Sequence, residues 1–268
     1  MIPVLETIAQ KFSVLPQVEA IALAGSQTTE AADEKSDFDL YVYATAEIAL
    51  DFRRALAESV SKRFEINNQF WEPGDEWIDA TSGICVDMMY RQPQWLEEQI
   101  ARVLVQHQAA VGYSTCFWYN VLHSKILFDR RGWFAQMQQR AAQPYPEALR
   151  RAIVAKNYPI LRRNLSSYLH QIESAVARQD AVSVQHRSAA LLASYFDILF
   201  ALNRLPHPGE KRLVAFARKH CAKLPDKMEE QIHQLIAATP TPQAALLIAN
   251  RLIDGLEHLL VAEQLLEN

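Results

Sequence analysis

Glycine is scarce in this chain, and its scarcity excludes several classes of nucleotide-binding protein. Only 7 of the 268 residues are glycine, and none of them forms the glycine-rich loop of a kinase, a P-loop protein or a dinucleotide-binding fold. The sequence contains no GxSxG turn of the kind that serine hydrolases use. Its 8 histidines show neither HExxH nor HxxxH spacing, so a zinc site is not expected.

Cysteines and long apolar runs are equally scarce. Cys85, Cys116 and Cys221 are scattered without a CxxC pair, so we expect free thiols in a cytoplasmic protein. No apolar run approaches the roughly 18 to 20 residues that span a membrane. The N-terminal segment carries Glu6 and is interrupted by prolines, unlike a signal peptide.

Charge is unevenly distributed along the chain. Residues 1–100 hold 7 Lys/Arg against 18 Asp/Glu, whereas residues 101–268 hold 20 against 13. An acidic first part suits cations and a basic second part suits phosphates, although ordinary surface charge gives the same imbalance. The net charge of −4 argues against DNA or RNA as the main partner.

The most informative stretch is residues 20–44. An apolar segment ends in Gly25-Ser26, and after a loop Asp37 and Asp39 lead into a second apolar segment. This order predicts a strand, a tight turn, a loop and a second strand. Asp37 and Asp39 are two residues apart, so in a strand their side chains share a face and repel each other unless a cation lies between them.

This pattern resembles the nucleotidyltransferase superfamily, which includes DNA polymerase beta and the aminoglycoside nucleotidyltransferases. The resemblance implies that Gly25 and Ser26 hold nucleotide phosphates and that Asp37 and Asp39 bind Mg²⁺. The turn, the spacing, the paired carboxylates and both flanking strands all agree with it. A strand–loop–strand with a solvated acidic edge is the alternative interpretation.

A third carboxylate, Asp87, lies in the apolar segment 84–90. A buried carboxylate in such a run is costly unless it is paired or bound to a metal. The resemblance implies that Asp87 completes the acidic triad from a neighbouring strand. Asp79 is the second candidate, in less strand-like surroundings, and an Asp at an exposed strand edge is the alternative.

The remaining elements of residues 1–140 follow from local patterns. We predict helices at 4–15, 46–64 and 93–112, extended segments at 65–71 and 124–128, and a turn at 73–75. Lys125, the second residue of the last of these segments, is a candidate nucleotide contact, with an ordinary surface lysine as the alternative.

From residue 133 onward the sequence is almost all helical. A linker with two prolines at 141–146 precedes helices at 147–178, with a break near Pro159, and at 180–203, 209–221, 225–238 and 241–265. We therefore predict an α+β fold, with a mixed-sheet catalytic domain over 1–140 and an all-α helical bundle over 141–268. The resemblance implies that the bundle lines the acceptor pocket.

A rigid polar turn at 203–212 interrupts the bundle. Pro206 and Pro208 fix its shape, and rigid polar loops often carry binding groups. Lys211 and Arg212 are therefore candidate contacts for the β- and γ-phosphates. The run is similar to one in uncharacterised bacterial nucleotidyltransferase-like proteins, and a helix-capping corner is the alternative interpretation.

The resemblance implies a Mg²⁺-dependent nucleotidyltransferase that moves AMP from ATP to a hydroxyl of a small-molecule acceptor. Asp37, Asp39 and Asp87 would be its metal-binding and catalytic residues. Two alternatives stay open: transfer of AMP onto a protein, as in toxin–antitoxin pairs, and a non-catalytic nucleotide-binding protein.

Overall fold

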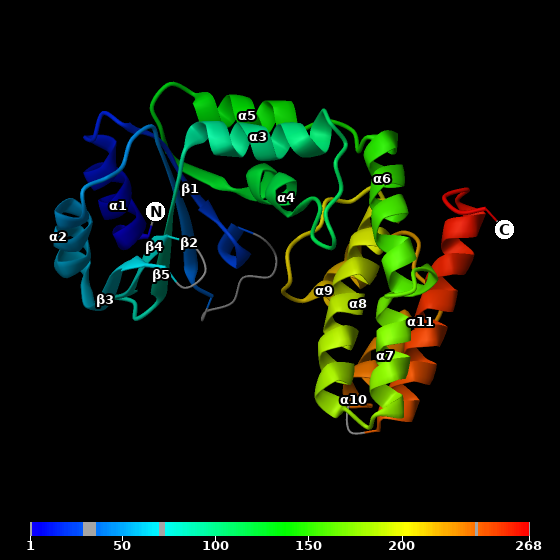
Figure 1. Ribbon diagram of the computed structural model, residues 1–268. Coiled ribbons are helices and arrows are strands. Elements are labelled where there is room, and N and C mark those ends of the chain that lie inside the picture. The colour runs from blue at the N-terminus through cyan, green and yellow to red at the C-terminus, as the bar shows by residue number, and fades with distance from the viewer. Residues whose placement is uncertain (1, 29–35, 70–72, 239–240, 268) are drawn as a thin grey trace. The chain divides into compact units, whose positions relative to one another are not determined.

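The computed structural model describes residues 2–28, 36–69, 73–238 and 241–267 (Figure 1). The chain divides into two compact units, one formed by residues 1–101 and 120–143, the other by residues 102–119 and 144–268. The first unit is built on a mixed six-stranded sheet, and the described elements of the second are helices. The protein is therefore of the α+β class.

The first unit contains the sheet and the helices around it. Its elements are α1 (Pro3–Ser13), β1 (Val18–Ala24), β2 (Phe38–Ala44), α2 (Leu50–Val60), β3 (Ser61–Asn68), β4 (Gly74–Asp79), β5 (Cys85–Arg91), most of α3 (Pro93–Leu104), the end of α4 (Cys116–His123), β6 (Lys125–Asp129) and α5 (Trp133–Ala141). The strand order is β3-β4-β5-β2-β1-β6. Only the β2–β5 pair is parallel, and the other neighbours are antiparallel.

One face of the sheet forms the core of the first unit. Phe38, Leu40 and Val42 of β2 are buried there with Ile8 and Phe12 of α1. Because side chains alternate along a strand, Asp39 and Tyr41 lie on the other face. The helices α1 and α2 cover the apolar face (Figure 1), so Asp39 lies on the face that these two helices do not cover.

The predicted helix at 46–64 is too long. Helix α2 ends at Val60, where the Ser61 hydroxyl donates to the Ala57 carbonyl at 2.6 Å. Strand β3 follows at once, because Phe64 and Ile66 alternate toward the core. The predicted turn at 73–75 is also wrong in part, since β4 begins at Gly74.

The second unit is a helical bundle with its own core. Its elements are α6 (Glu147–Tyr158), a π-helical turn (Pro159–Arg163), α7 (Tyr168–Ala177), α8 (Ala181–Leu202), α9 (Leu213–His220), α10 (Met228–Ala237) and α11 (Pro242–Ala262). The break expected near Pro159 is the π-helical turn, because proline removes a backbone donor from the helix. Within the described ranges, no helix is both long and apolar enough to cross a membrane.

Residues 102–119 group with the second unit, although the sequence placed them in the first domain. The predicted helix at 93–112 ends at Leu104. Beyond it, the Gly112 N–H donates to Asn157 Oδ1 at 2.9 Å, and Asn157 Nδ2 donates to the Ala110 carbonyl at 3.0 Å. These contacts with a distant helix outweigh the local helical pattern.

Candidate functional site

Gly25 shapes the turn that follows β1. Its φ of +66° is a conformation that glycine adopts without the steric cost of a side chain. The Gly25 carbonyl accepts hydrogen bonds from the N–H (3.3 Å) and the hydroxyl (3.0 Å) of Thr28. The Gln27 amide donates to the Ser36 carbonyl at 2.6 Å, which ties the two ends of the loop together. Ser26 lies in this turn, but its side chain is outside the described part of the structure.

Gly25 and Asp39 are direct neighbours. A Cβ atom added to Gly25 would lie 1.8 Å from Oδ2 and 2.6 Å from Cγ of Asp39, much closer than nonbonded atoms approach each other. In the β1–β2 pairing, Asp39 lies opposite Ala24. Only glycine at position 25 therefore leaves room for the Asp39 carboxylate. The glycine turn and the Asp39 strand of the sequence motif lie side by side.

A row of carboxylates crosses four strands from this point. Asp39 of β2 lies opposite Asp87 of β5. Asp87 in turn lies opposite Glu76 of β4, which lies opposite Glu65 of β3. Residues paired in this way share a face of the sheet, and like charges directly opposite each other are destabilising. The row therefore costs stability that bound cations would restore.

The thiol of Cys85 lies within the electric field of these carboxylates. Cys85 precedes Asp87 by two residues in β5, so their side chains share a face. Burial raises the pKa of the Cys85 thiol, and the charges of Asp37, Glu76, Asp87 and Asp39 raise it further, to about 11. Asp37, exposed just before β2, thus adds to the same negative field.

The donor chemistry of this group fits a hard divalent cation. Carboxylate oxygens are the ligands that Mg²⁺ prefers, and Asp39 and Asp87 lie opposite each other on adjacent strands. Within the described ranges, no three His, Cys, Asp or Glu side chains are gathered into a group that could hold a metal ion. A cation would therefore have to draw these carboxylates together.

An arginine lies on the same face as the carboxylate row. Arg91 follows Asp87 by four residues in β5, and its guanidinium carbon lies 4.1 Å from the Trp95 ring centre and 6.0 Å from that of Tyr41. Burial raises the pKa of Tyr41 to about 12; Arg91 opposes this shift, and Asp39 and Asp87 add to it. Tyr41 therefore keeps its proton, and Arg91 supplies positive charge on this face.

The structure separates Lys125 and Asp79 from this row. Lys125 is exposed and pairs with Leu23, whose side chain is in the core, so the register gives Lys125 the face opposite to Asp39. Asp79 accepts hydrogen bonds from the Ser82 N–H and hydroxyl, both at 2.7 Å. The second candidate for a third carboxylate thus closes the turn between β4 and β5.

Lys211 and Arg212 belong to the second unit. Both are exposed, and Arg212 precedes the first residue of α9 with a φ of +55°. The turn that carries them is anchored by His207, which is buried and whose backbone N–H donates to Thr115 Oγ1 at 2.7 Å.

Sequence reasoning did not identify Glu76, Glu65 or Arg91. The alternation of apolar and polar residues at 61–68 would have placed Glu65 on the face of the sheet opposite to the core. The alignment of Glu65 and Glu76 with Asp87 depends on pairings between strands, which no local pattern reveals. Arg91 was the easiest to find, because it follows Asp87 by four residues in the same strand and so has its side chain on the same face.

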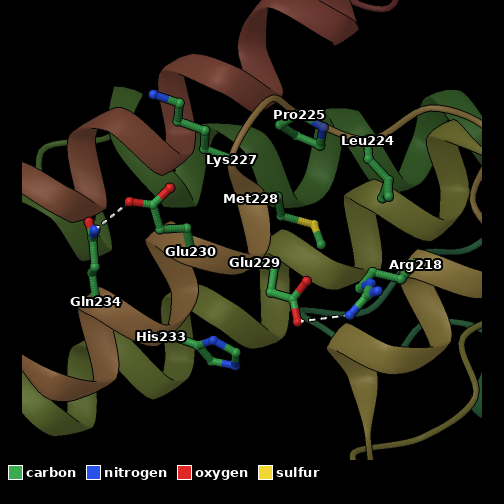
Figure 2. A pocket seen from close by; sticks show the side chains of 9 residues that line it. All are labelled: Arg218, Leu224, Pro225, Lys227, Met228, Glu229, Glu230, His233 and Gln234. Atoms are coloured by element: carbon green, nitrogen blue, oxygen red, sulfur yellow. Dashed lines mark hydrogen bonds and ion pairs between the residues drawn. The ribbon is translucent and has the colours of Figure 1, made fainter.

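A surface hollow of about 620 Å³ lies in the second unit, beside α9 and α10 (Figure 2). Both of its carboxylates accept hydrogen bonds from residues that line it: Arg218 donates to Glu229 at 3.2 Å, and Gln234 donates to Glu230 at 2.9 Å. Met228 and Pro225 supply apolar surface between them. None of the candidate residues predicted from the sequence lines this hollow.

One known family matches part of the chain. The family described as "Domain of unknown function (DUF4037)" matches residues 118–213. This range begins in α4, ends at Leu213, and leaves out Gly25, Asp39 and Asp87. No curated protein matches the sequence.

Two solved structures are similar to the chain at low identity. A nucleotidyltransferase-like protein from Exiguobacterium sibiricum is 15% identical with a TM-score of 0.45, over 96% of this chain and 73% of its own. A CCA-adding enzyme from Thermotoga maritima, complexed with tRNA, is 11% identical with a TM-score of 0.36, over 89% of this chain and 57% of its own. Likenesses this distant do not assign a substrate.

Proposed function

We propose that this chain is a Mg²⁺-dependent nucleotidyltransferase that moves AMP from ATP onto a hydroxyl of a small-molecule acceptor. The observation that carries the proposal is the contact of Gly25 with Asp39, together with the pairing of Asp39 with Asp87. Because Gly25 has no side chain, the Asp39 carboxylate lies directly against the turn whose backbone would face the phosphates. Carboxylates on the adjoining strands then provide the oxygen ligands that a nucleotide–Mg²⁺ complex requires.

The chain's own residues have three tasks in this reaction. Gly25 and Ser26 offer backbone to the phosphates, while Asp37, Asp39 and Asp87 would hold Mg²⁺, which neutralises the triphosphate charge when bound. Asp87 accepts the proton of the acceptor hydroxyl. The acceptor oxygen then bonds to the α-phosphorus, the bond to the bridging oxygen breaks, and pyrophosphate leaves.

Asp39→Asn and Asp87→Asn test this proposal. Each variant should weaken Mg²⁺-dependent ATP binding by about 30-fold or more, because loss of one charged partner costs about 2 kcal/mol or more. Each should also stabilise the free protein slightly, since a like-charge pair is relieved. Calorimetric titration of ATP with and without Mg²⁺, alongside thermal unfolding, measures both effects.

Asp51→Asn is the matched control, because Asp51 is exposed on α2 of the same unit and does not belong to the row. It should leave ATP affinity unchanged. If Asp39→Asn and Asp87→Asn bind ATP and Mg²⁺ as well as the control does, these residues do not hold the metal and the proposed function is wrong. Tight binding without pyrophosphate release, over a range of acceptors, would instead identify a nucleotide-binding protein.

Glu76→Gln tests whether the carboxylate row extends the site. Glu76 lies opposite Asp87 and next to a further carboxylate, Glu65. The variant should weaken Mg²⁺ binding severalfold at low salt and much less at high salt, because it removes a neighbouring charge rather than a ligand. Calorimetric Mg²⁺ titrations at two salt concentrations measure this effect. A large loss of Mg²⁺ affinity that is the same at both concentrations would show that Glu76 is a metal ligand.

Lys211 and Arg212 remain proposed contacts for the β- and γ-phosphates. Their exposed positive charge supports this role, since paired cations stabilise phosphates during phosphoryl transfer. Lys125 has less support, because its register gives it the face opposite to Asp39.

A further inference from the structure

Residues 105–115 form a loop that lies closely against the helical bundle. Gly112, with a φ of +72°, packs so tightly that an added Cβ would come within 3.3 Å of the Ala193 side chain on α8. The Gly112 N–H donates to Asn157 of α6 at 2.9 Å. The loop is thus fixed to two helices, and its end leads directly into α4.

The centre of this contact is a buried carboxylate on α8. Asp197 Oδ1 accepts a hydrogen bond from the Ser114 N–H at 2.9 Å. Its Oδ2 accepts from the Ser114 hydroxyl at 2.6 Å and from Asn157 Nδ2 at 3.2 Å. Burial raises the pKa of Asp197 to about 7, and the hydrogen bonds from Ser114 and Asn157 oppose that shift. Asp197 therefore gains or loses its proton near neutral pH.

The Ser114 hydroxyl has two acceptors within reach but only one proton. It lies 2.6 Å from Asp197 Oδ2 and 3.3 Å from the Ala110 carbonyl, and it accepts a hydrogen bond from the Ala110 N–H at 2.9 Å. When Asp197 is ionised, the hydroxyl donates to the carboxylate. When Asp197 is protonated, its own O–H can donate to Ser114, whose proton then turns to Ala110. Both protonation states are satisfied, by different hydrogen bonds in the loop.

Other groups around Asp197 stay neutral while it titrates. Burial raises the pKa values of the Tyr113, Cys116 and Tyr145 side chains, each of which is affected by the Asp197 charge. Burial lowers the pKa of His207 to about 4. Two charged groups also shift the pKa values of these neighbours. The exposed Glu210 raises the pKa values of Tyr113 and Cys116, and Arg150 lowers that of Tyr145.

We propose that Asp197 and Ser114 form a proton-operated latch that holds residues 105–115 on the bundle. The latch is tight when Asp197 is protonated and loosens when it is ionised, because opening the loop hydrates the carboxylate. Helix α4 begins at Cys116 and carries Asn120, whose side chain is hydrogen-bonded to Tyr41 on the sheet. The latch therefore sets how firmly the first turn of α4 is anchored, independently of the proposed enzymatic activity.

Hydrogen exchange of the full chain tests the latch. After correction for intrinsic exchange, the population of open loop at residues 110–116 should rise about tenfold per pH unit between roughly pH 5 and 7 and level off above that, because the closed loop binds the proton more tightly. Asp197→Asn, which cannot ionise, should stay protected at every pH. Ser114→Ala removes one hydrogen-bond donor to the carboxylate, so the pKa of Asp197 should rise. The pH at which the population of open loop levels off should therefore be higher than in the wild type.

Asp180→Asn is the matched control. Asp180 is the N-cap of the same helix and accepts from the Ser183 N–H at 3.0 Å and hydroxyl at 2.6 Å, but it is not buried. Its variant should keep the wild-type pH profile at residues 110–116. Wild-type protection without pH dependence overturns the proposal, and so does an unchanged profile in Asp197→Asn. If Asp197→Asn fails to fold, the Ser114→Ala variant decides. A pH dependence of loop opening identical to that of the wild type would then overturn the proposed latch.

Discussion

Gly25→Ala should abolish ATP binding and destabilise the sheet unit by several kcal/mol. The new methyl group would lie 1.8 Å from Asp39 Oδ2, and such overpacking costs about 1–3 kcal/mol. The left-handed backbone at Gly25 adds roughly 1 kcal/mol more. Either the turn or the Asp39 side chain must move, and both belong to the proposed phosphate and metal site. Urea unfolding and ATP titration measure the two effects.

Gly83→Ala separates backbone strain from overlap. Gly83 has a similar φ, +72°, but an added Cβ would meet no heavy atom within 4 Å. This control should lose only about 1 kcal/mol and keep its ATP affinity. Equal losses in both glycine variants would show that the Asp39 contact contributes nothing.

A double variant isolates the contact itself. Asp39→Ala removes the Oδ2 and Cγ atoms that the Gly25→Ala methyl group would overlap. Gly25→Ala combined with Asp39→Ala should therefore be more stable than the sum of the single losses predicts. It should nevertheless fail to bind ATP with Mg²⁺, so stability and binding would respond in opposite directions.

The parts of the site that the sequence revealed are local in the chain. The turn at Gly25 and the strands that carry Asp39 and Asp87 could be predicted, because alternation and glycine act over a few residues. The pairing of Asp87 with Glu76 could not, because register depends on the core packing of strands far apart in the sequence.

Two errors in the fold have the same origin. The pattern at 93–112 is helical to its end, yet the Gly112 N–H and the Ala110 carbonyl bond to Asn157 of a distant helix. The pattern at 46–64 predicts a helix that continues past Val60. Instead, Phe64 and Ile66 pack against the core of the sheet unit as part of β3. In both places tertiary contacts override local propensity.

Arg53→Met should destabilise the sheet unit by about 3–5 kcal/mol, because it leaves a carboxylate buried without its cation. Asp75 on β4 is fully buried, and both of its oxygens bond to the Arg53 guanidinium of α2, Nε to Oδ2 at 2.8 Å. The Tyr90 hydroxyl and the Asn67 N–H also donate to this carboxylate, at 2.7 and 2.9 Å. Urea unfolding followed by a signal from the sheet unit measures the loss.

Tyr90→Phe is the milder comparison, since it removes one hydrogen bond and should cost about 1 kcal/mol. The decisive variant combines Arg53→Met with Asp75→Leu. Replacing a buried ion pair by apolar groups of similar volume is often neutral, so the double variant should recover most of the stability lost in Arg53→Met. A double variant as unstable as Arg53→Met would mean that packing of the arginine stem, rather than the charge left on Asp75, causes the loss. Recovery would show that the polar residues beneath β4 and β5 contribute through their pairing, on the face opposite to the carboxylate row.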